Sequence, residues 1–63
     1  TSLADDEVKV LALLAEGLPL DAVARRLNMS ERTIRRRVKA ICDRLGVPAA
    51  ITAVAWAAKR GLL

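Results

Sequence analysis

Apolar positions recur at helical spacing between residues 30 and 45. Successive members are separated by four, three, one and three positions, which is the pattern of a helix that buries a single face. They are Ile34, Val38, Ile41, Cys42 and Leu45. Ser30 precedes the first of them and offers a side-chain oxygen for the N-cap, and Glu31 suits the positive end of the helix dipole. The sequence therefore predicts a helix over the stretch from Ser30 to Leu45.

The remaining faces of this helix are strongly basic. The face opposite the apolar stripe carries Arg32, Arg36, Lys39 and Asp43, while Arg35 lies on one shoulder and Thr33, Arg37 and Arg44 lie on the other. A basic helix with an apolar back is suited to insertion into the groove of a nucleic acid. The alternative is a basic helix face that is merely solvated.

Two helices are predicted before the basic one. The first runs from about Ser2 to Glu16, with Ser2 as its candidate cap and Gly17 as the residue that ends it. The second runs from about Leu20 to Leu27, and Asn28 is suited to a left-handed turn after it. A short helix, a tight turn and a basic helix form the helix-turn-helix pattern, which covers about residues 19–39 here.

A last helix is predicted from about Pro48 to Arg60, between Gly46 and Gly61. Its inward stripe consists of small side chains, Ala53, Val54 and Ala57, which implies close approach to another helix. The apolar residues left on its surface are Ile51, Ala55, Trp56 and Ala58. They predict a dimer contact with Trp56 as anchor, and the alternative is that Trp56 covers the first helix of its own domain.

Length and composition limit the chain to one small all-α domain over residues 1–63. Trp56 is the only aromatic residue, which argues against RNA-binding and single-strand-binding modules that need stacking platforms. The longest apolar run, residues 49–58, is too short to span a bilayer. Because the chain begins with Thr1 and shows no signal peptide, we expect a piece of a longer cytoplasmic protein, and a single cysteine fits that compartment.

Charge is distributed unevenly along the chain. The net charge is +4, but residues 1–24 carry −4, residues 25–44 carry +6 and residues 45–63 carry +2. A strongly basic middle segment beside an acidic start indicates a polyanionic partner.

The side chains needed for catalysis or metal binding are scarce. The sequence has no histidine, its three glycines are isolated, and its single cysteine, Cys42, falls on the apolar stripe, where it is expected to be a core residue. The acidic run Asp5, Asp6 and Glu7 lies at a helix start, where capping and solubility explain it. We therefore expect no enzyme activity, cofactor, metal or small-molecule substrate in this domain.

Several segments together resemble a known family. They are LALLAEGL at 11–18, VARRL at 23–27, MSERTI at 29–34, RLGV at 44–47 and AV at 53–54. This pattern resembles the LuxR-type, or GerE-type, helix-turn-helix domain found in the output half of many bacterial response regulators and quorum sensors. The resemblance extends from Leu3 to Leu62. It implies a four-helix all-α domain whose third helix enters the major groove of DNA and whose fourth helix commonly forms the dimer contact.

The resemblance also implies roles for individual positions. Thr33 and the amide end of the third helix would hold phosphates, and Arg35, Arg36 and Lys39 would face the groove floor. With the charge pattern added, the expected base contacts are Arg35, Arg36, Lys39 and Arg32. The expected phosphate contacts are Thr33, Ser30, Arg37, Arg44, Arg25 and Arg26.

Five positions depart from the family pattern. Asp6 replaces the usual arginine before the first-helix glutamate, and Ala4 replaces the usual cap. Leu20 replaces the polar residue that opens the second helix. Arg37 replaces the third-helix histidine, and Ala50 replaces the arginine after the L-G-V turn.

The sequence thus predicts a sequence-specific double-stranded DNA-binding domain, the C-terminal output domain of a bacterial two-component transcription regulator that acts as a homodimer. RNA polymerase is a candidate further partner. Two alternatives remain: a helical dimerisation or protein-docking module that has lost operator binding, and a promoter-recognition domain like region 4 of sigma factors.

Overall fold

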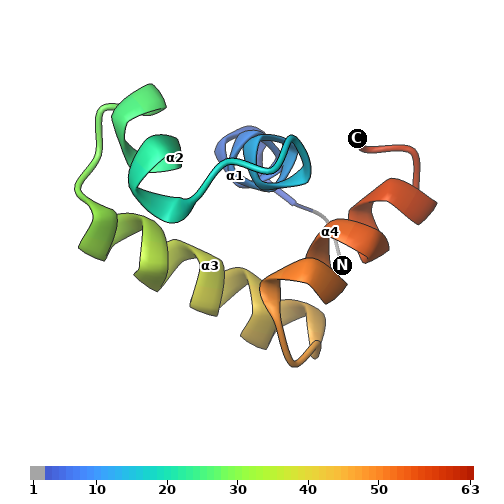
Figure 1. The fold of residues 1–63 in the computed structure, drawn as a ribbon. Helices are drawn as coiled ribbons and strands as arrows, with labels where there is room; N and C mark the ends of the chain where they lie inside the picture. The colour runs from blue at the N-terminus through green and yellow to red at the C-terminus, as the bar shows by residue number, and fades with distance from the viewer. Residues whose placement is uncertain (1–2) are drawn as a thin grey trace.

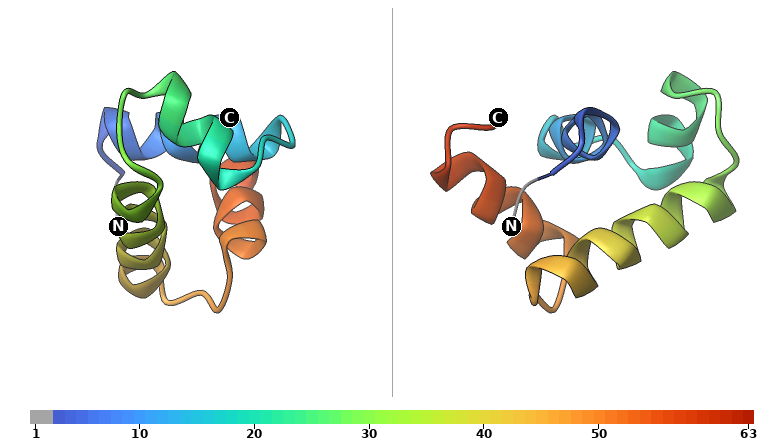
Figure 2. Two further views of the ribbon diagram at one scale, coloured as in Figure 1. Left: turned by 60° about the vertical axis from the view of Figure 1, so that its left-hand side comes forward. Right: turned by 180° about the vertical axis from the view of Figure 1, so that it is seen from behind.

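The computed structural model describes residues 3–63, which form four helices and, within that range, no strand. The helices are α1 (Asp5–Ala15), α2 (Leu20–Arg26), α3 (Glu31–Leu45) and α4 (Ala50–Lys59). Figure 1 shows α1 almost end-on between α2 and α4, with α3 running below. The two views of Figure 2 show α3 and α4 on the same side of α1, joined by a tight connection. The all-α, four-helix fold class is confirmed.

The start of α1 was predicted too early. The helix begins at Asp5, because Ala4 is still extended at φ −73° and ψ 160°. Alanine has no side-chain oxygen with which to cap the helix, but the Glu7 carboxylate accepts the Ala4 N–H at 2.8 Å from inside the first turn. The predicted cap Ser2 lies outside the described residues.

The turn between α2 and α3 has the geometry expected from the sequence. Asn28 takes the left-handed conformation at φ 56°, which asparagine tolerates better than most residues. The Met29 N–H then donates to the Ala24 carbonyl at 2.9 Å, and the Asn28 N–H donates to Arg25. These two bonds form a Schellman motif, so α2 ends at Arg26 and the chain turns directly into α3.

Both ends of α3 follow the predicted signals. The Ser30 hydroxyl accepts the Thr33 N–H at 3.1 Å, which confirms Ser30 as the N-cap. Gly46, at φ 70°, ends the helix after Leu45 in a left-handed conformation that favours glycine. The helix therefore has fixed ends and a fixed register.

Helix α4 is two residues shorter at its start than predicted. Ala49 is extended at φ −152° and ψ 160°, and its carbonyl accepts the first helical N–H groups, from Thr52 and Ala53. The helix therefore begins at Ala50, and the predicted start at Pro48 belongs to the connection. At the other end Arg60 is the C-cap, one residue past the last helical residue Lys59.

The core consists of two clusters that share α1 and α3. One contains Leu11, Ile41, Cys42, Ala53 and Ala57, and the other contains Val10, Val23, Ala24 and Ile34. The predicted apolar stripe of α3 is confirmed, because Ile34, Ile41 and Cys42 are buried. Burial also raises the pKa of the Cys42 thiol, as expected for a core cysteine.

Within residues 3–63 no single helix is long and apolar enough to cross a membrane, and only α3 and α4 together, bent by 58°, have the length and composition.

Candidate nucleic-acid interface

The surface of α3 that faces away from the core is basic and exposed. The helix carries six bases against two acids, and burial of Ile34 and Ile41 turns Arg32, Arg36 and Lys39 outward. Thr33, Arg36, Arg37 and Ala40 line a shallow hollow on this surface. We call this side of α3, defined by Arg32, Thr33, Arg36, Lys39 and Ala40, the outward face.

The eight bases of residues 25–44 fall into three groups by their ion pairs. Three of them, Arg26, Arg32 and Arg36, have no ion-pair partner anywhere in the range 3–63, and all three are exposed. Arg32 and Arg36 lie on the outward face, one turn apart. Their guanidinium groups are the ones immediately available to a ligand.

A second group pairs one turn away within its own helix. Arg25 contacts Asp21 at 3.2 Å, Arg35 contacts Glu31 at 2.6 Å, and Lys39 contacts Asp43 at 3.3 Å. All six of these side chains are largely exposed to solvent, so each pair contributes only about 0.3–0.5 kcal/mol. Such pairs are weak enough to exchange for a phosphate.

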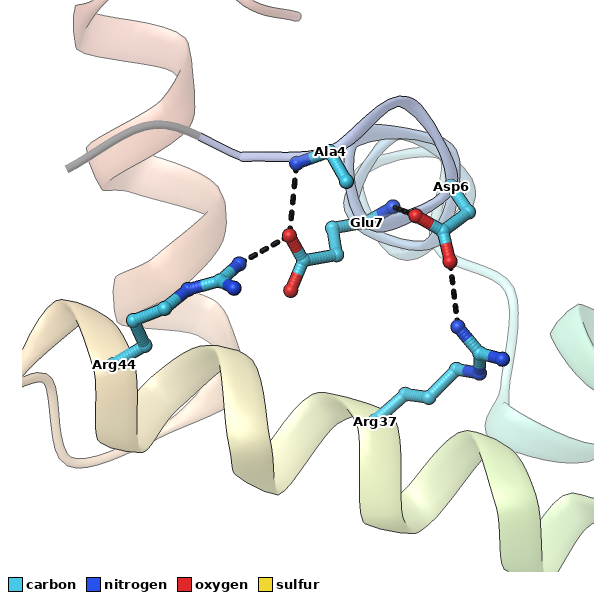
Figure 3. Close-up of polar contacts among 5 residues, drawn as sticks. All are labelled: Ala4, Asp6, Glu7, Arg37 and Arg44. Carbon is cyan, nitrogen blue, oxygen red and sulfur yellow. Dashed lines mark hydrogen bonds and ion pairs between the residues drawn. The ribbon is translucent and has the colours of Figure 1, made fainter.

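The third group ties α3 to the start of α1, as Figure 3 shows. Arg37 donates to the Asp6 carboxylate at 2.6 Å, and Arg44 donates to the Glu7 carboxylate. Glu7 is the more enclosed acid, with 15% of its side chain exposed, and it also accepts the Ala4 N–H. The hydrogen bond from Arg44 lowers the pKa of the Glu7 carboxyl below its ordinary value, more than burial raises it.

These two ion pairs occupy side chains that were predicted to contact phosphates. The sequence placed Arg37 and Arg44 on one shoulder of α3 and assigned both to phosphates, but the structure gives each a carboxylate partner on α1. Asp6 and Glu7 were interpreted as capping and solubility residues, so their role in holding α3 was missed. The sequence shows three acids at the start of the first helix and two bases on one shoulder of α3, but it does not show that these groups meet.

The hydroxyls predicted to bind phosphates lie together at the N-terminus of α3. Ser30 Oγ and Thr33 Oγ1 are 2.9 Å apart and hydrogen-bonded to each other. Ser30 is exposed and Thr33 is half-buried beside the hollow. Their phosphate role stays a prediction, made from a position where the helix dipole favours an anion.

The predicted dimer residues are spread around α4 and differ in exposure. Ile51, Ala55 and Ala58 follow each other at spacings of four and three and are exposed, with Ile51 at 79%. Trp56 lies about 140° around the helix from Ile51 at 100° per residue. It packs against the cluster of Leu11 and Ile41, and Arg60 covers its ring at 4.0 Å from the centroid. Trp56 therefore packs on its own domain, as in the alternative interpretation of the sequence, and a part for it in a dimer contact stays a prediction.

Comparison with known proteins decides the family. Residues 1–57 match the family described as bacterial regulatory proteins, luxR family. The chain belongs to the LuxR family. It is a LuxR-family helix-turn-helix domain, of the class that binds DNA in transcription regulation, and this family is not a class of enzymes.

A curated relative agrees with this assignment. The LuxR-family chain is 40% identical over all of its 63 residues to the transcriptional regulatory protein YdfI of Bacillus subtilis (strain 168). It spans 30% of the length of that protein.

The Arg44–Glu7 tie makes a prediction about stability and pH. Because the folded pKa of Glu7 is lowered, the tie stabilises the LuxR-family domain above the ordinary glutamate pKa of about 4.3, and the contribution is lost as pH falls through the folded pKa. Glu7→Gln should therefore lower the free energy of unfolding by about 1 kcal/mol at pH 7 and by less at pH 2.5, measured by urea unfolding.

Glu16→Gln is the matched control, since Glu16 is exposed and has no ion-pair partner within 3–63. It should stay within about 0.5 kcal/mol of the wild type at both pH values. A Glu7→Gln penalty that is the same at pH 7 and pH 2.5 would contradict a role for the carboxylate charge.

Proposed function

We propose that the domain binds double-stranded DNA sequence-specifically, with the outward face of α3 in the major groove. The observation that carries this proposal is that Arg32 and Arg36 are exposed on that face without an ion-pair partner in residues 3–63. An α-helix fits the major groove, and a free arginine can donate two hydrogen bonds to guanine O6 and N7. The small side chain of Ala40, also on the outward face, leaves room for close approach.

The proposal assigns different roles to the predicted contact residues. Arg32 and Arg36 are the first choice for base contacts because they are free, and Lys39 and Arg35 join them if their weak pairs with Asp43 and Glu31 open. Phosphate contacts come from the N-terminal end of α3 and the last turn of α2. These are Ser30, Thr33, Arg25 and Arg26.

The wider context is also a proposal. The relative YdfI is a transcriptional regulatory protein more than three times as long as this chain. We infer that the domain is likewise the DNA-binding output part of a longer bacterial transcription regulator of the two-component type, in the cytoplasm. RNA polymerase is the further partner that such a role would bring.

The test of base readout is Arg36→Ala on a site selected from random duplexes. The change should weaken binding to the preferred site by about 1–3 kcal/mol and relax the preference at one base position, because a bidentate base contact is lost. Lys59→Ala, which removes one positive charge from the end of α4, is the control and should keep the preference intact.

Two results would contradict the proposal. If Arg36→Ala weakens all sequences equally, the outward face binds the backbone and does not read bases. If the wild-type domain binds no duplex even at low salt, the alternative of a docking module without DNA binding is correct.

We also propose a two-fold dimer through α4 on DNA, formed by Ile51, Ala55 and Ala58. Ile51 is the most exposed large apolar side chain in the described range, and the two alanines extend its surface along the helix. Leu14, Ala15 and Val54 border Ile51 in a shallow apolar groove. An isologous contact of this kind would place two α3 helices in successive major grooves, about 10 base pairs apart.

The dimer predicts that Ile51→Glu abolishes cooperative loading of a duplex with two half-sites, measured by sedimentation, because a charge cannot be buried at the two-fold contact. Binding to a single half-site should be unchanged. Thr52→Glu is the control, since it adds the same charge in the same turn about 100° around the helix. Unchanged cooperativity in Ile51→Glu would show that α4 is not the dimer contact.

A further inference from the structure

We propose that Asp6 competes with the DNA backbone for Arg37, so that the Arg37 guanidinium exchanges a carboxylate for a phosphate when duplex DNA binds. Asp6 would then set the affinity of the domain for DNA and the dependence of that affinity on salt. This inference rests on the proposed DNA-binding function and adds a residue from α1 that lies outside the helix-turn-helix.

The geometry gives Asp6 the character of an internal phosphate substitute. Its Oδ1 atom accepts the Glu7 N–H at 3.0 Å, which fixes the carboxylate, and its Oδ2 atom accepts from Arg37 at 2.6 Å. Figure 3 shows the Arg37 side chain extending from α3 to reach this carboxylate at the start of α1. The Arg37 guanidinium is therefore held by an anionic oxygen, which is also what a phosphate would offer it.

Arg37 is also placed to reach DNA. It lines the same hollow as Thr33 and Arg36, which are assigned to phosphate and base contacts on the outward face. Its side chain is 40% exposed and that of Asp6 is 52% exposed, so solvent and a ligand can reach the pair. A backbone phosphate lying over this hollow would compete directly with Asp6.

The pair with Asp6 does not satisfy Arg37. The Nε atom of Arg37 is buried and has no hydrogen-bond acceptor in the part of the chain that the structure describes. A buried donor without an acceptor is unfavourable. When the Arg37 side chain turns away from Asp6 toward a phosphate, its Nε and a terminal N–H can donate to two oxygens of that phosphate. The Arg37–Asp6 pair is thus exposed and incomplete, which favours exchange.

The neighbouring tie provides a contrast within the same molecule. The Glu7 side chain is mostly enclosed and holds both Arg44 and the Ala4 N–H. Breaking that tie would leave a mostly enclosed carboxylate without its charged partner. We therefore assign the Arg44–Glu7 tie to holding α3 in place and the Arg37–Asp6 pair to exchange.

The exchange has a consequence for counterions. A base that is free before binding releases about one counterion from the DNA for each phosphate it neutralises. When Arg37 leaves Asp6, the freed carboxylate attracts cations from solution, which offsets part of that release. Asp6 should therefore make binding both weaker and less dependent on salt than the positive charge of α3 alone would give.

The experiment measures affinity for a single-half-site duplex over a range of salt concentrations. Asp6→Asn keeps the oxygen that accepts the Glu7 N–H and removes the charge. We expect it to bind DNA about 2–5-fold tighter than the Asp5→Asn control at low salt, because an exposed ion pair contributes free energy of that size. We also expect its plot of log affinity against log salt to be steeper, by at most about 0.9.

Asp5→Asn is the matched control, because Asp5 is an exposed acid of the same turn with no ion-pair partner in residues 3–63. It makes the same change in net charge and should leave the salt slope within error of the wild type. Arg37→Ala completes the test. The loss of DNA affinity that it causes should be about 2–5-fold larger in the Asp6→Asn background than in the wild type. Circular dichroism melts within about 5 °C of the wild type show that each variant is folded.

The inference is overturned if Asp6→Asn and Asp5→Asn tighten DNA binding equally and give equal salt slopes. In that case only the total negative charge at the start of α1 affects binding, and the Arg37–Asp6 pair has no specific role. It is also overturned if Arg37→Ala costs the same affinity in both backgrounds, since the Arg37–Asp6 pair then persists on DNA. A wild-type domain that binds no duplex removes the proposed function itself, and that result is distinguishable from the other two.

Discussion

Burial of Ile34 and Ile41 determines what the rest of α3 can do. Both side chains are fully enclosed, one in each core cluster, so the helix cannot rotate without exposing one of them. With the apolar side of α3 fixed, Arg32 and Arg36 must point away from the core. The caps at Ser30 and Gly46 hold the helix in the same register at both ends. The basic outward face is therefore a consequence of core packing.

The acidic start of α1 is the counterpart of that basic helix. Asp6 and Glu7 lie beside one shoulder of α3 and neutralise Arg37 and Arg44, while the outward face keeps its unpaired guanidinium groups. The domain thus separates its bases by position: some stabilise the packing of α1 on α3, and others remain available to a polyanion. This division explains how a chain of net charge +4 can present a basic face and still fold around α3.

Much of this structure could be predicted from the sequence. Local chemistry marks helix ends at Ser30, Asn28 and Gly46, so the order of the helices was predicted correctly. The spacing of the apolar stripe of α3 also identified the buried face of that helix correctly. The partners of Arg37 and Arg44 could not be predicted, because they depend on where α1 crosses α3. The family pattern flagged Asp6 and Arg37 separately as unusual, and the structure shows that they contact each other.

The packing of Trp56 could be predicted only in part. Its angular position on α4, about 140° from Ile51, was available from the sequence, but the sequence left open whether Trp56 anchors a dimer or covers its own domain. In the folded chain Trp56 packs on the core cluster under Arg60, and Ile51 is left as the exposed apolar side chain of α4. The boundaries of α1 and α4 were misplaced because extended alanines, Ala4 and Ala49, occupy the cap positions and carry no side-chain signal.

The central claim is that the outward face of α3 is the surface that meets duplex DNA. The most direct measurement is an NMR titration of the isotope-labelled domain with a duplex carrying one selected half-site at low salt. The account predicts that the largest backbone amide shifts fall within residues 30–40, centred on Arg32, Thr33 and Arg36, with residues 50–59 nearly unchanged. Shifts confined to α4, or no shifts at all, would contradict it.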